Sequence, residues 1–456
     1  MTDTSEKKIV KTASGEARKA YEQIVLRSFW RNVAAMTAFD VLWFIGMAFV
    51  VQAVFSPAYL NTLGAPKTII GLVSAMFFIT VPMNLLSDRA AGRGRRKVRV
   101  TIFFGASGVV YILLGSLAMI CPDGYSGLQI LLYSLGTLVF FSFINLGNPI
   151  YWEVVIDNIP MRRRGRVHAF RATAAGVSGF TCVRFAEWVT QQFDEIRSFH
   201  VSLVFAGFFF IVASLTPLLI RDNVDPARRK QRKSTSTLPL WREVQLLLLR
   251  LWYRPSYRGF IFFAFLLVGG CALGPFLVTY AQDVLKISPD TLEGQLKMVF
   301  LSMIIIGGLA MGSLADRWGF RVAAILQAAT LAVAFWVAIG SRGNISLLVA
   351  YALYACTFWA SGVMLSNLSI ELMPRIRITR LIAGMNLFLL PAYLLLPWSC
   401  GYVIDLGKGG GDSIESYHMV FAIGMILAIL SALGFALLVQ EPRTGKTLVI
   451  RRIRRA

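Results

Sequence analysis

The chain has 456 residues, of which 56% are hydrophobic and only 15% are charged, and its mean hydropathy is +0.63. A soluble globular protein of this length would carry far more charge, so the composition excludes that class and indicates a membrane protein. The net charge of +22 raises nucleic-acid binding as an alternative, which the placement of the basic residues described below disfavours.

The amino-terminal segment 1–31 is polar and basic, with neither the apolar core nor the small-residue cleavage site of a signal peptide. From Arg18 to Arg31, apolar side chains recur at helical spacing beside basic ones, which predicts an interfacial helix before the first span. Two further basic segments are expected on the same side of the membrane: a linker with its own amphipathic helix, 221–256, and a tail, 441–456.

About 20 apolar residues cross the hydrocarbon of a bilayer, and the chain contains twelve such stretches with short connections. They are expected at 33–56, 68–86, 98–120, 127–150, 167–191, 199–220, 257–281, 296–315, 320–340, 345–370, 379–404 and 416–438. The alternation that is typical of transmembrane β-strands does not occur in them. The expected fold is therefore an all-α membrane protein with twelve transmembrane helices.

The basic residues are distributed unevenly between the two sides of these spans. With the amino terminus inside, 39 of the 46 lysines and arginines fall in inner segments and six in outer ones. This is the positive-inside rule, and it predicts a multi-pass protein of the plasma (inner) membrane with both termini in the cytoplasm. The basicity is then explained by topology and by attraction to anionic membrane lipids, without a nucleic-acid partner.

Three short motifs occur twice in the same order, 214–228 positions apart. They are Asp88-Arg89 with Asp316-Arg317, Asp157-Asn-Ile-Pro160 with Glu371-Leu-Met-Pro374, and Ser198-Phe-His200 with Ser416-Tyr-His418. Arg166 and Arg380 each follow the proline of their motif by six residues. These repeats predict an internal duplication with two six-helix bundles, 32–220 and 257–440.

The better copy of the first motif reads Gly312-Ser-Leu-Ala-Asp316-Arg317-Trp-Gly319-Phe-Arg321. It resembles the turn Gly-x-x-x-Asp-Arg-x-Gly-Arg-Arg/Lys that follows the second span in the major facilitator superfamily. The copy at Asp88 departs from that pattern, with Asn84 in the glycine position and an extra residue before Gly92. The resemblance covers roughly residues 30–443 and does not identify a subfamily.

The resemblance implies two bundles that work by alternating access, with the two turns acting as a gate on the cytoplasmic side. The residues expected in the turns of this gate are Asp88, Arg89, Gly312, Asp316, Arg317, Gly319 and Arg321. The residues expected beside them, at the neighbouring inner ends, are Glu153, Asp157, Arg166, Glu371 and Arg380.

Asp40 lies near the middle of the first expected span. A carboxylate at this depth costs several kcal/mol unless it is paired, hydrated or protonated, and such residues are usually functional. Asp40 is therefore expected to couple a proton or to hold a cationic group of the substrate. The alternative is a fixed structural ion pair.

Arg184 and Glu187, in the fifth expected span, are three residues apart on one helical face. They either pair with each other, or Arg184 faces the cavity and meets Asp40 or an anionic group of the substrate. Further polar residues expected to line the cavity are Asn145, Asn148, Asn386 and Tyr393. Asp405, His200 and His418 fall near outer ends, where we expect them at the solvated interface.

The expected function is secondary active transport of a small solute by alternating access, coupled to protons through Asp40. The alternatives are an uncoupled facilitator, a lipid translocator, or a transporter-like membrane receptor or scaffold. No nucleotide-binding loop occurs, and the five cysteines show no metal-ligand spacing. We therefore expect no cofactor, no metal and no enzyme activity, and we expect a monomer.

Overall fold

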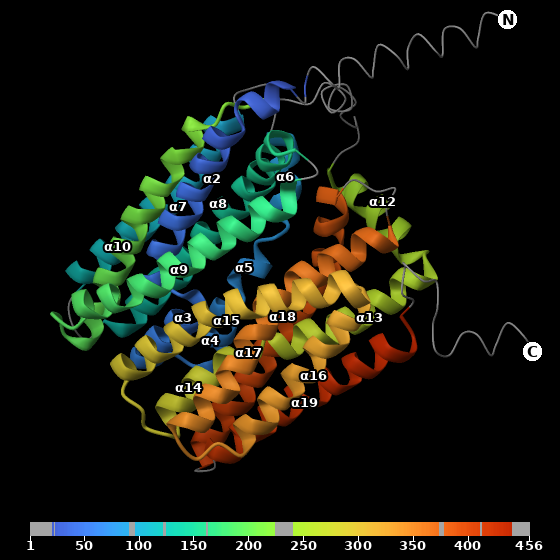
Figure 1. The fold of residues 1–456 in the computed structure, drawn as a ribbon. Coiled ribbons are helices and arrows are strands. Elements are labelled where there is room, and N and C mark those ends of the chain that lie inside the picture. The colour runs from blue at the N-terminus through green and yellow to red at the C-terminus, as the bar shows by residue number, and fades with distance from the viewer. Residues whose placement is uncertain are drawn as a thin grey trace, which may run out of the picture.

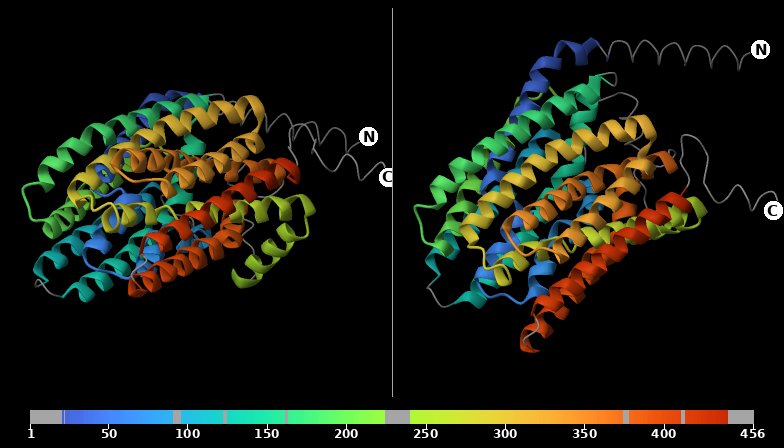
Figure 2. Two further views of the ribbon diagram at one scale, coloured as in Figure 1. Left: turned by 90° about the horizontal axis from the view of Figure 1, so that it is seen from below. Right: turned by 60° about the horizontal axis from the view of Figure 1, so that its bottom comes forward.

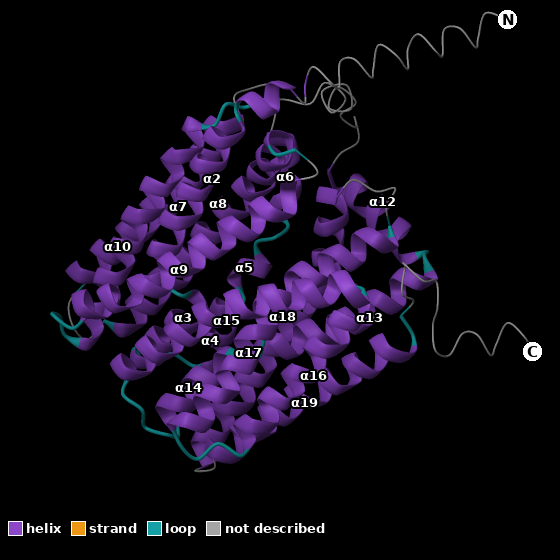
Figure 3. Ribbon diagram, in the orientation of Figure 1, coloured by secondary structure: helices purple, strands orange, loops and turns teal. Residues whose placement is uncertain are grey.

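The structure is a computed structural model that describes residues 21, 23–90, 96–121, 125–160, 163–223, 240–373, 378–410 and 413–439. The described chain is helical, with short connections and no strand in these ranges (Figure 3). The helices of the first half are α2 (Phe29–Phe49), α3 (Gln52–Thr62), α4 (Lys67–Ser74), α5 (Met76–Ile79), α6 (Met83–Ala90), α7 (Arg96–Ile120), α8 (Ser126–Asn158), α9 (Arg164–Thr190), α10 (Glu195–Leu215) and the 3-10 helix η2 (Thr216–Leu219). Those of the second half are α12 (Leu240–Trp252), α13 (Pro255–Cys271), α14 (Pro275–Asp283), α15 (Pro289–Trp318), α16 (Phe320–Ile339), α17 (Asn344–Leu372), α18 (Ile378–Gly410) and α19 (Ser413–Leu437).

Ten helical stretches in the described part of the chain are long and apolar enough to cross a membrane. They correspond to ten of the twelve predicted spans. The other two predicted spans are also helical. The span expected at 68–86 is divided among α4, α5 and α6, and the one expected at 167–191 lies in α9, a 27-residue helix that is less apolar.

Most helices of the first half lie on one side of the molecule and most of those of the second half on the other, while α3, α4 and α5 lie against second-half helices (Figure 1). Figure 2 shows the same helices from two further directions. We call the end of the molecule where α2, α7 and α13 begin the linker end, because α12 lies there. The opposite end, where α3, α14 and α18 end, is the distal end. The long helices run between these two ends (Figure 1).

The predicted basic segments are only partly described. Residues 23–27 are helical and precede α2, with Ile24 and Leu26 exposed and Val25 buried, in keeping with the expected interfacial helix. The amphipathic helix expected in the linker is present as α12. The tail at 441–456 and most of the polar part of the linker lie outside the described residues.

Three predicted spans are interrupted in the described residues: the first between α2 and α3, the second among α4, α5 and α6, and the seventh between α13 and α14. At the first two, a polar side chain binds a freed backbone carbonyl. The first span breaks at Val50 and Val51, and the ammonium of Lys297 in α15 donates to the carbonyl of Phe49 at 2.7 Å. The second breaks between α5 and α6, where the Asn145 amide donates to the Phe77 carbonyl at 2.9 Å. Carbonyls freed inside an apolar bundle need such partners.

The pairs α7–α10 and α16–α19 are joined in the same way at the linker end. Lys97, at the second position of α7, donates to the carbonyls of Leu218 and Ile220 at the end of η2. Arg321, at the second position of α16, donates to the carbonyls of Phe435 and Ala436 at the end of α19. A cation at a helix carboxyl terminus is favourable, and the shared arrangement supports the predicted duplication.

Candidate functional site

The carboxylate of Asp40 is held by Arg171. The Arg171 guanidinium donates from Nε to one carboxylate oxygen at 2.6 Å and from Nη2 to the other at 3.0 Å. The side chain of Arg171 is 4% exposed and that of Asp40 is 20% exposed. A bidentate, largely buried pair of this kind is strong in geometry but costly to desolvate, and removing one partner costs about 3–5 kcal/mol.

Tyr151 completes this group of three residues. Its hydroxyl accepts a hydrogen bond from Arg171 Nη2 and lies 3.5 Å from Asp40 Oδ1. The Arg171 guanidinium also lies over the Tyr151 ring, 5.7 Å from its centroid. Asp40, Tyr151 and Arg171 come from α2, α8 and α9 of the first half. Arg171 is seven residues into α9, about 10 Å along its axis from the linker end.

Arg171 Nη1 is buried and has no hydrogen-bond partner among the described residues. Arg171 is not among the site residues predicted from the sequence, because it ends a basic run that resembles an inner loop. In the structure Arg171 shares a helical face with the buried Ala175 and with Ser178, which bonds the backbone of α2. Neither contact can be read from the sequence.

Of the two alternatives for Arg184, the structure has the pair within α9. Arg184 Nη1 lies 3.0 Å from Glu187 Oε2, and the Arg184 side chain is 78% exposed. Arg184 therefore does not meet Asp40. Glu187 instead reaches the second half: its carboxylate lies so close to Gly294 of α15 that a Cβ there would be 1.9 Å from Oε1.

The four polar residues that were expected to line the cavity do not share one environment in the structure. Asn145 is buried and is occupied at the break of the second span, where it bonds Phe77 and Thr80. Tyr393 is buried and stacks on Phe78 of the first half, with ring centroids 3.7 Å apart. Asn148 and Asn386 are half-buried, and their role as substrate contacts stays a prediction.

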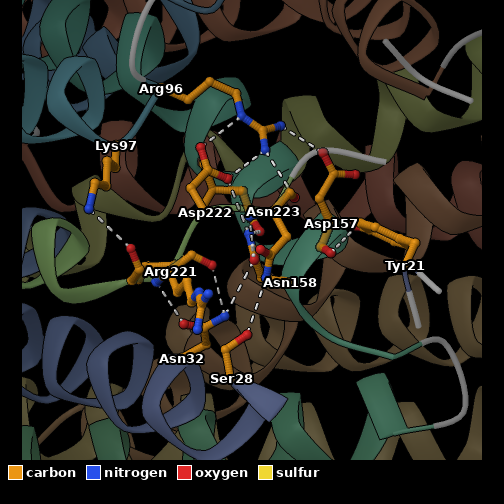
Figure 4. Close-up of polar contacts among 12 residues, drawn as sticks. Tyr21, Ser28, Asn32, Arg96, Lys97, Asp157, Asn158, Arg221, Asp222 and Asn223 are labelled. Carbon is orange, nitrogen blue, oxygen red and sulfur yellow. Dashed lines mark hydrogen bonds and ion pairs between the residues drawn. The ribbon is translucent and has the colours of Figure 1, made fainter. Parts of the chain in front are cut away.

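At the linker end, Arg96 at the start of α7 connects two carboxylates (Figure 4). Nη1 lies 2.6 Å from Asp157 at the end of α8, and Nη2 lies 2.6 Å from Asp222, which follows η2. Asn158 extends the cluster, donating to Asp222 at 3.3 Å and accepting from the Asn223 amide at 3.0 Å. All of these residues belong to the first half or to the start of the linker.

The amino-terminal segment joins the same cluster. Asn32 of α2 accepts from the Arg221 amide at 2.9 Å and donates to Asn158 at 3.3 Å, and Tyr21 donates to the Asp157 carbonyl. Figure 4 shows the side chains converging from α2, α7, α8 and the linker. The cluster therefore ties the beginning of the linker to the bundle that precedes it.

The other residues of the predicted cytoplasmic gate are placed as follows. The side chains of Asp88, Arg89, Arg166 and Asp316 lie outside the described part of the structure, so their contacts stay predictions. Glu153, Glu371 and Arg380 lie near linker ends of α8, α17 and α18, and Arg317 is exposed in the last turn of α15. Gly312 faces open space, whereas Gly319 has φ of +92°, which favours glycine in the tight α15–α16 turn.

The distal end carries a polar contact between the two halves, which we call the distal latch: Asn61, Lys67 and Thr68 of the first half with Asp283 and Asp405 of the second. Asp405 accepts from the Lys67 amide at 2.8 Å, from the Thr68 amide at 3.0 Å and from the Thr68 hydroxyl at 2.7 Å. These amides begin α4, so Asp405 caps a helix of the other half.

The ion pair of the latch lies beside this cap. The buried Lys67 ammonium is 2.8 Å from Asp283, and the Asn61 amide donates to the same aspartate at 3.0 Å. The two halves also touch through glycines. A Cβ at Gly71 would lie 2.6 Å from the Pro397 carbonyl, and one at Gly401 would lie 2.5 Å from the Lys67 carbonyl. The distal end is closed by backbone-to-backbone contact.

The expectation that His200 lies at a solvated interface is wrong. Its side chain is 2% exposed, and Nε2 lies 3.0 Å from the Tyr59 hydroxyl inside the first half. His200 is the sixth residue of α10 and turns inward onto α3, where Tyr59 packs against its ring and against that of Phe199. A helical residue near an outer end can face the bundle as easily as the solvent, and sequence position alone does not decide between them.

A bundle of long apolar helices with charged pairs at its centre and both ends defines a multi-pass integral membrane protein. The sequence profile of the Major Facilitator Superfamily matches residues 41–397, and the chain belongs to this family of membrane transporters. No curated protein matches the sequence.

Solved transporters share the fold. A D-xylose–proton symporter has a TM-score of 0.67 at 15% identity, covering 92% of this chain and 100% of its own. The xylose transporter XylE from E. coli, in a partially occluded inward-open conformation, has a TM-score of 0.63 at 15% identity, covering 92% and 99%. The nucleoside transporter NupG has a TM-score of 0.62 at 14% identity, covering 88% and 98%.

Proposed function

We propose that this protein is a secondary transporter that moves a small solute by alternating access, coupled to protons through Asp40. Its twelve spans form two six-helix bundles, 32–220 and 257–440, with the linker end in the cytoplasm. The ten membrane-length helical stretches, together with the helical segments α4–α6 and the less apolar α9, support this proposed count. The shared binding of Lys97 and Arg321 to helix ends supports two related bundles.

The observation that carries the coupling proposal is the Asp40–Arg171–Tyr151 group. Protonation of Asp40 removes the charge that balances Arg171, so the bidentate pair loses most of its attraction. The guanidinium is then free to donate to another acceptor, from the solute or from water. Because Arg171 Nη1 already lacks a partner among the described residues, such an acceptor meets an unsatisfied donor.

The distal latch supports the alternating-access part of the proposal. In the described state the halves touch backbone to backbone at Gly71 and Gly401. Access from the distal side therefore requires that α4 and α18 separate and that Asp405 release the amino end of α4. We take this as the state closed to the outside.

The solved structures with the same fold suggest which solutes to test first. Among these solved structures are a D-xylose–proton symporter, the xylose transporter XylE and the nucleoside transporter NupG. Pentoses, hexoses and nucleosides therefore begin the panel, followed by small organic anions. Binding is measured as a thermal shift of the purified protein.

The coupling is tested in proteoliposomes with a solute from that panel. Asp40→Asn should retain exchange of labelled for unlabelled solute and lose accumulation driven by an inward proton gradient. Arg197→Gln, an exposed arginine at the distal end, serves as the matched control and should keep both. Gradient-driven accumulation by Asp40→Asn equal to that of the wild type would overturn the coupling. If the proton gradient does not change solute uptake by the wild type, the protein is an uncoupled facilitator instead.

A further inference from the structure

Helix α12 presents two different faces. Its protein-facing side packs on α18: a Cβ at Gly384 would lie 2.8 Å from the Leu251 side chain and 3.1 Å from that of Leu247. Leu251 is fully buried there, and the Trp252 ring stacks on Phe388 with centroids 5.9 Å apart. This side anchors α12 to the linker end of α18 in the second half, beside α13.

The exposed surface of α12 and of Tyr253, which follows it, carries several large apolar side chains. Trp241 is 62% exposed and Tyr253 is 77% exposed, and Leu246, Leu249 and Trp252 are exposed as well. Isolated apolar residues on a surface need no explanation, but five within one 14-residue segment form a patch that water does not favour. Tryptophan and tyrosine are the residues that prefer the boundary between hydrocarbon and headgroups.

Exposed arginines accompany the patch. Arg242, Arg250, Arg254 and Arg258 all lie between residues 240 and 260, and Glu243 is the one acidic residue in that stretch of sequence. The Arg242 guanidinium lies over the Trp241 ring, 5.2 Å from its centroid. Arginines beside aromatic and aliphatic residues suit a surface that is apolar below and negatively charged above.

The position of α12 in the chain brings this surface to the membrane. Only Tyr253 and Arg254 separate α12 from α13, which starts a membrane-spanning stretch at Pro255. The helix therefore lies within a few residues of the point where the chain enters the bilayer. The leaflet on the linker side is the surface that its exposed face can reach without any rearrangement.

We propose that α12 binds the anionic phospholipids of that leaflet and fixes the linker end of α18 to them. The same helix α18 carries Pro397, Gly401 and Asp405 of the distal contact, so the lipid bound at α12 holds a helix that must move when the distal end opens. The anionic lipid content of the leaflet then tunes the transport cycle.

The binding is tested on the full-length protein in nanodiscs by hydrogen–deuterium exchange. Peptides spanning 240–258 should exchange more slowly in phosphatidylcholine containing about one third phosphatidylglycerol than in phosphatidylcholine alone. The difference should shrink at high salt, because salt screens exposed charges. Each arginine near an anionic surface strengthens binding about fivefold, so Arg242→Gln, Arg250→Gln and Arg254→Gln together should weaken it on the order of a hundredfold.

The control removes two exposed arginines of the distal end, Arg197→Gln and Arg342→Gln, and should leave the lipid effect on 240–258 unchanged. Equal protection in both lipids, or lipid-dependent protection that persists in the triple variant, would overturn the proposal. Protection that appears only with a soluble protein partner would do the same. The readout does not depend on transport, so a failure of the proposed transport function leaves this test intact.

Discussion

Gly401 in α18 and Gly71 in α4 lie where the two halves meet at the distal end, and alanine at either position should open that end. A Cβ on Gly401 would lie 2.5 Å from the Lys67 carbonyl oxygen and 2.6 Å from the Thr68 nitrogen. A Cβ on Gly71 would lie 2.6 Å from the Pro397 carbonyl oxygen. These neighbours are backbone atoms, which cannot rotate away as a side chain can, so α4 and α18 must move apart.

The size of the effect follows from the usual cost of overpacking. One added methyl in a tightly packed contact costs about 1–3 kcal/mol. Because the clash exists only while the distal end is closed, that cost acts on the equilibrium between the two states. The ratio of closed to open protein should therefore fall about 5- to 150-fold in Gly401→Ala. The same direction is expected for Gly71→Ala.

The assay is the distance between two spin labels at the distal end, in a variant without its five native cysteines. Exposed positions Gly127 in α8 and Arg342 before α17 place one label on each half. Gly401→Ala should shift the distribution to longer distances. Gly108→Ala is the matched control, because its Cβ would lie 2.7 Å from the Gly207 carbonyl, within one half. It should lower the melting temperature and leave the distances unchanged.

An unchanged distribution in both Gly71→Ala and Gly401→Ala would refute the reasoning, provided that the control shows the loss of stability. It would mean that the backbone contact yields without separating the halves. Longer distances in Gly108→Ala as well would show that the labels report general loosening rather than opening of the distal end.

The remaining predictions concern the two charged clusters at the ends of the molecule. Asp405→Ala removes the cap on the amino end of α4, which stabilises it by about 0.5–2 kcal/mol. The variant should also shift the spin-label distances to longer values. A distance distribution like that of the wild type would contradict the role of Asp405 in holding the distal end closed. Arg96→Gln leaves Asp157 buried without its cation, at about 3–5 kcal/mol, and should lower the melting temperature of the purified protein strongly. Lys97→Gln loses only partly exposed hydrogen bonds to carbonyls, so it should lower the free energy of unfolding by less than about 1 kcal/mol. Equal losses of stability in Arg96→Gln and Lys97→Gln would count against a special role for Arg96.

The spans and Asp40 could be predicted from the sequence because each is a local signal. A run of about 20 apolar residues predicts a membrane span without knowledge of the rest of the fold, and an acidic residue within such a run can be recognised from the sequence alone. The helical pair Arg184–Glu187 is local in the same sense, since residues three apart share a face. The sequence alone could not choose between that pair and a contact to Asp40, because the choice depends on which face of α9 meets α2.

The partners of Asp40 and the distal latch could not be predicted, because both depend on contacts between distant segments. Arg171 belongs to a basic run whose other members fit an inner loop, and the predicted span 167–191 includes Arg171 without showing which segment its side chain meets. Lys67 and Asp405 are 338 positions apart, and each alone fits an exposed outer connection. In the structure Lys67 is completely buried, and Lys67 and Asp405 each contact the half of the molecule to which the other belongs.

The two sites are linked by one discontinuous helix. Asp40 lies on α2, and Asn61 of the distal latch lies near the end of α3, which continues the same span. The break between α2 and α3 is itself held by the second half, since Lys297 of α15 binds the Phe49 carbonyl there. A rotation of α2 on release of Arg171 would act directly on this carbonyl and on its cross-half lysine. The Asp40–Arg171 pair lies wholly within the first half, so the proposed proton coupling needs a contact with the second half, and we propose that the interrupted first span supplies it.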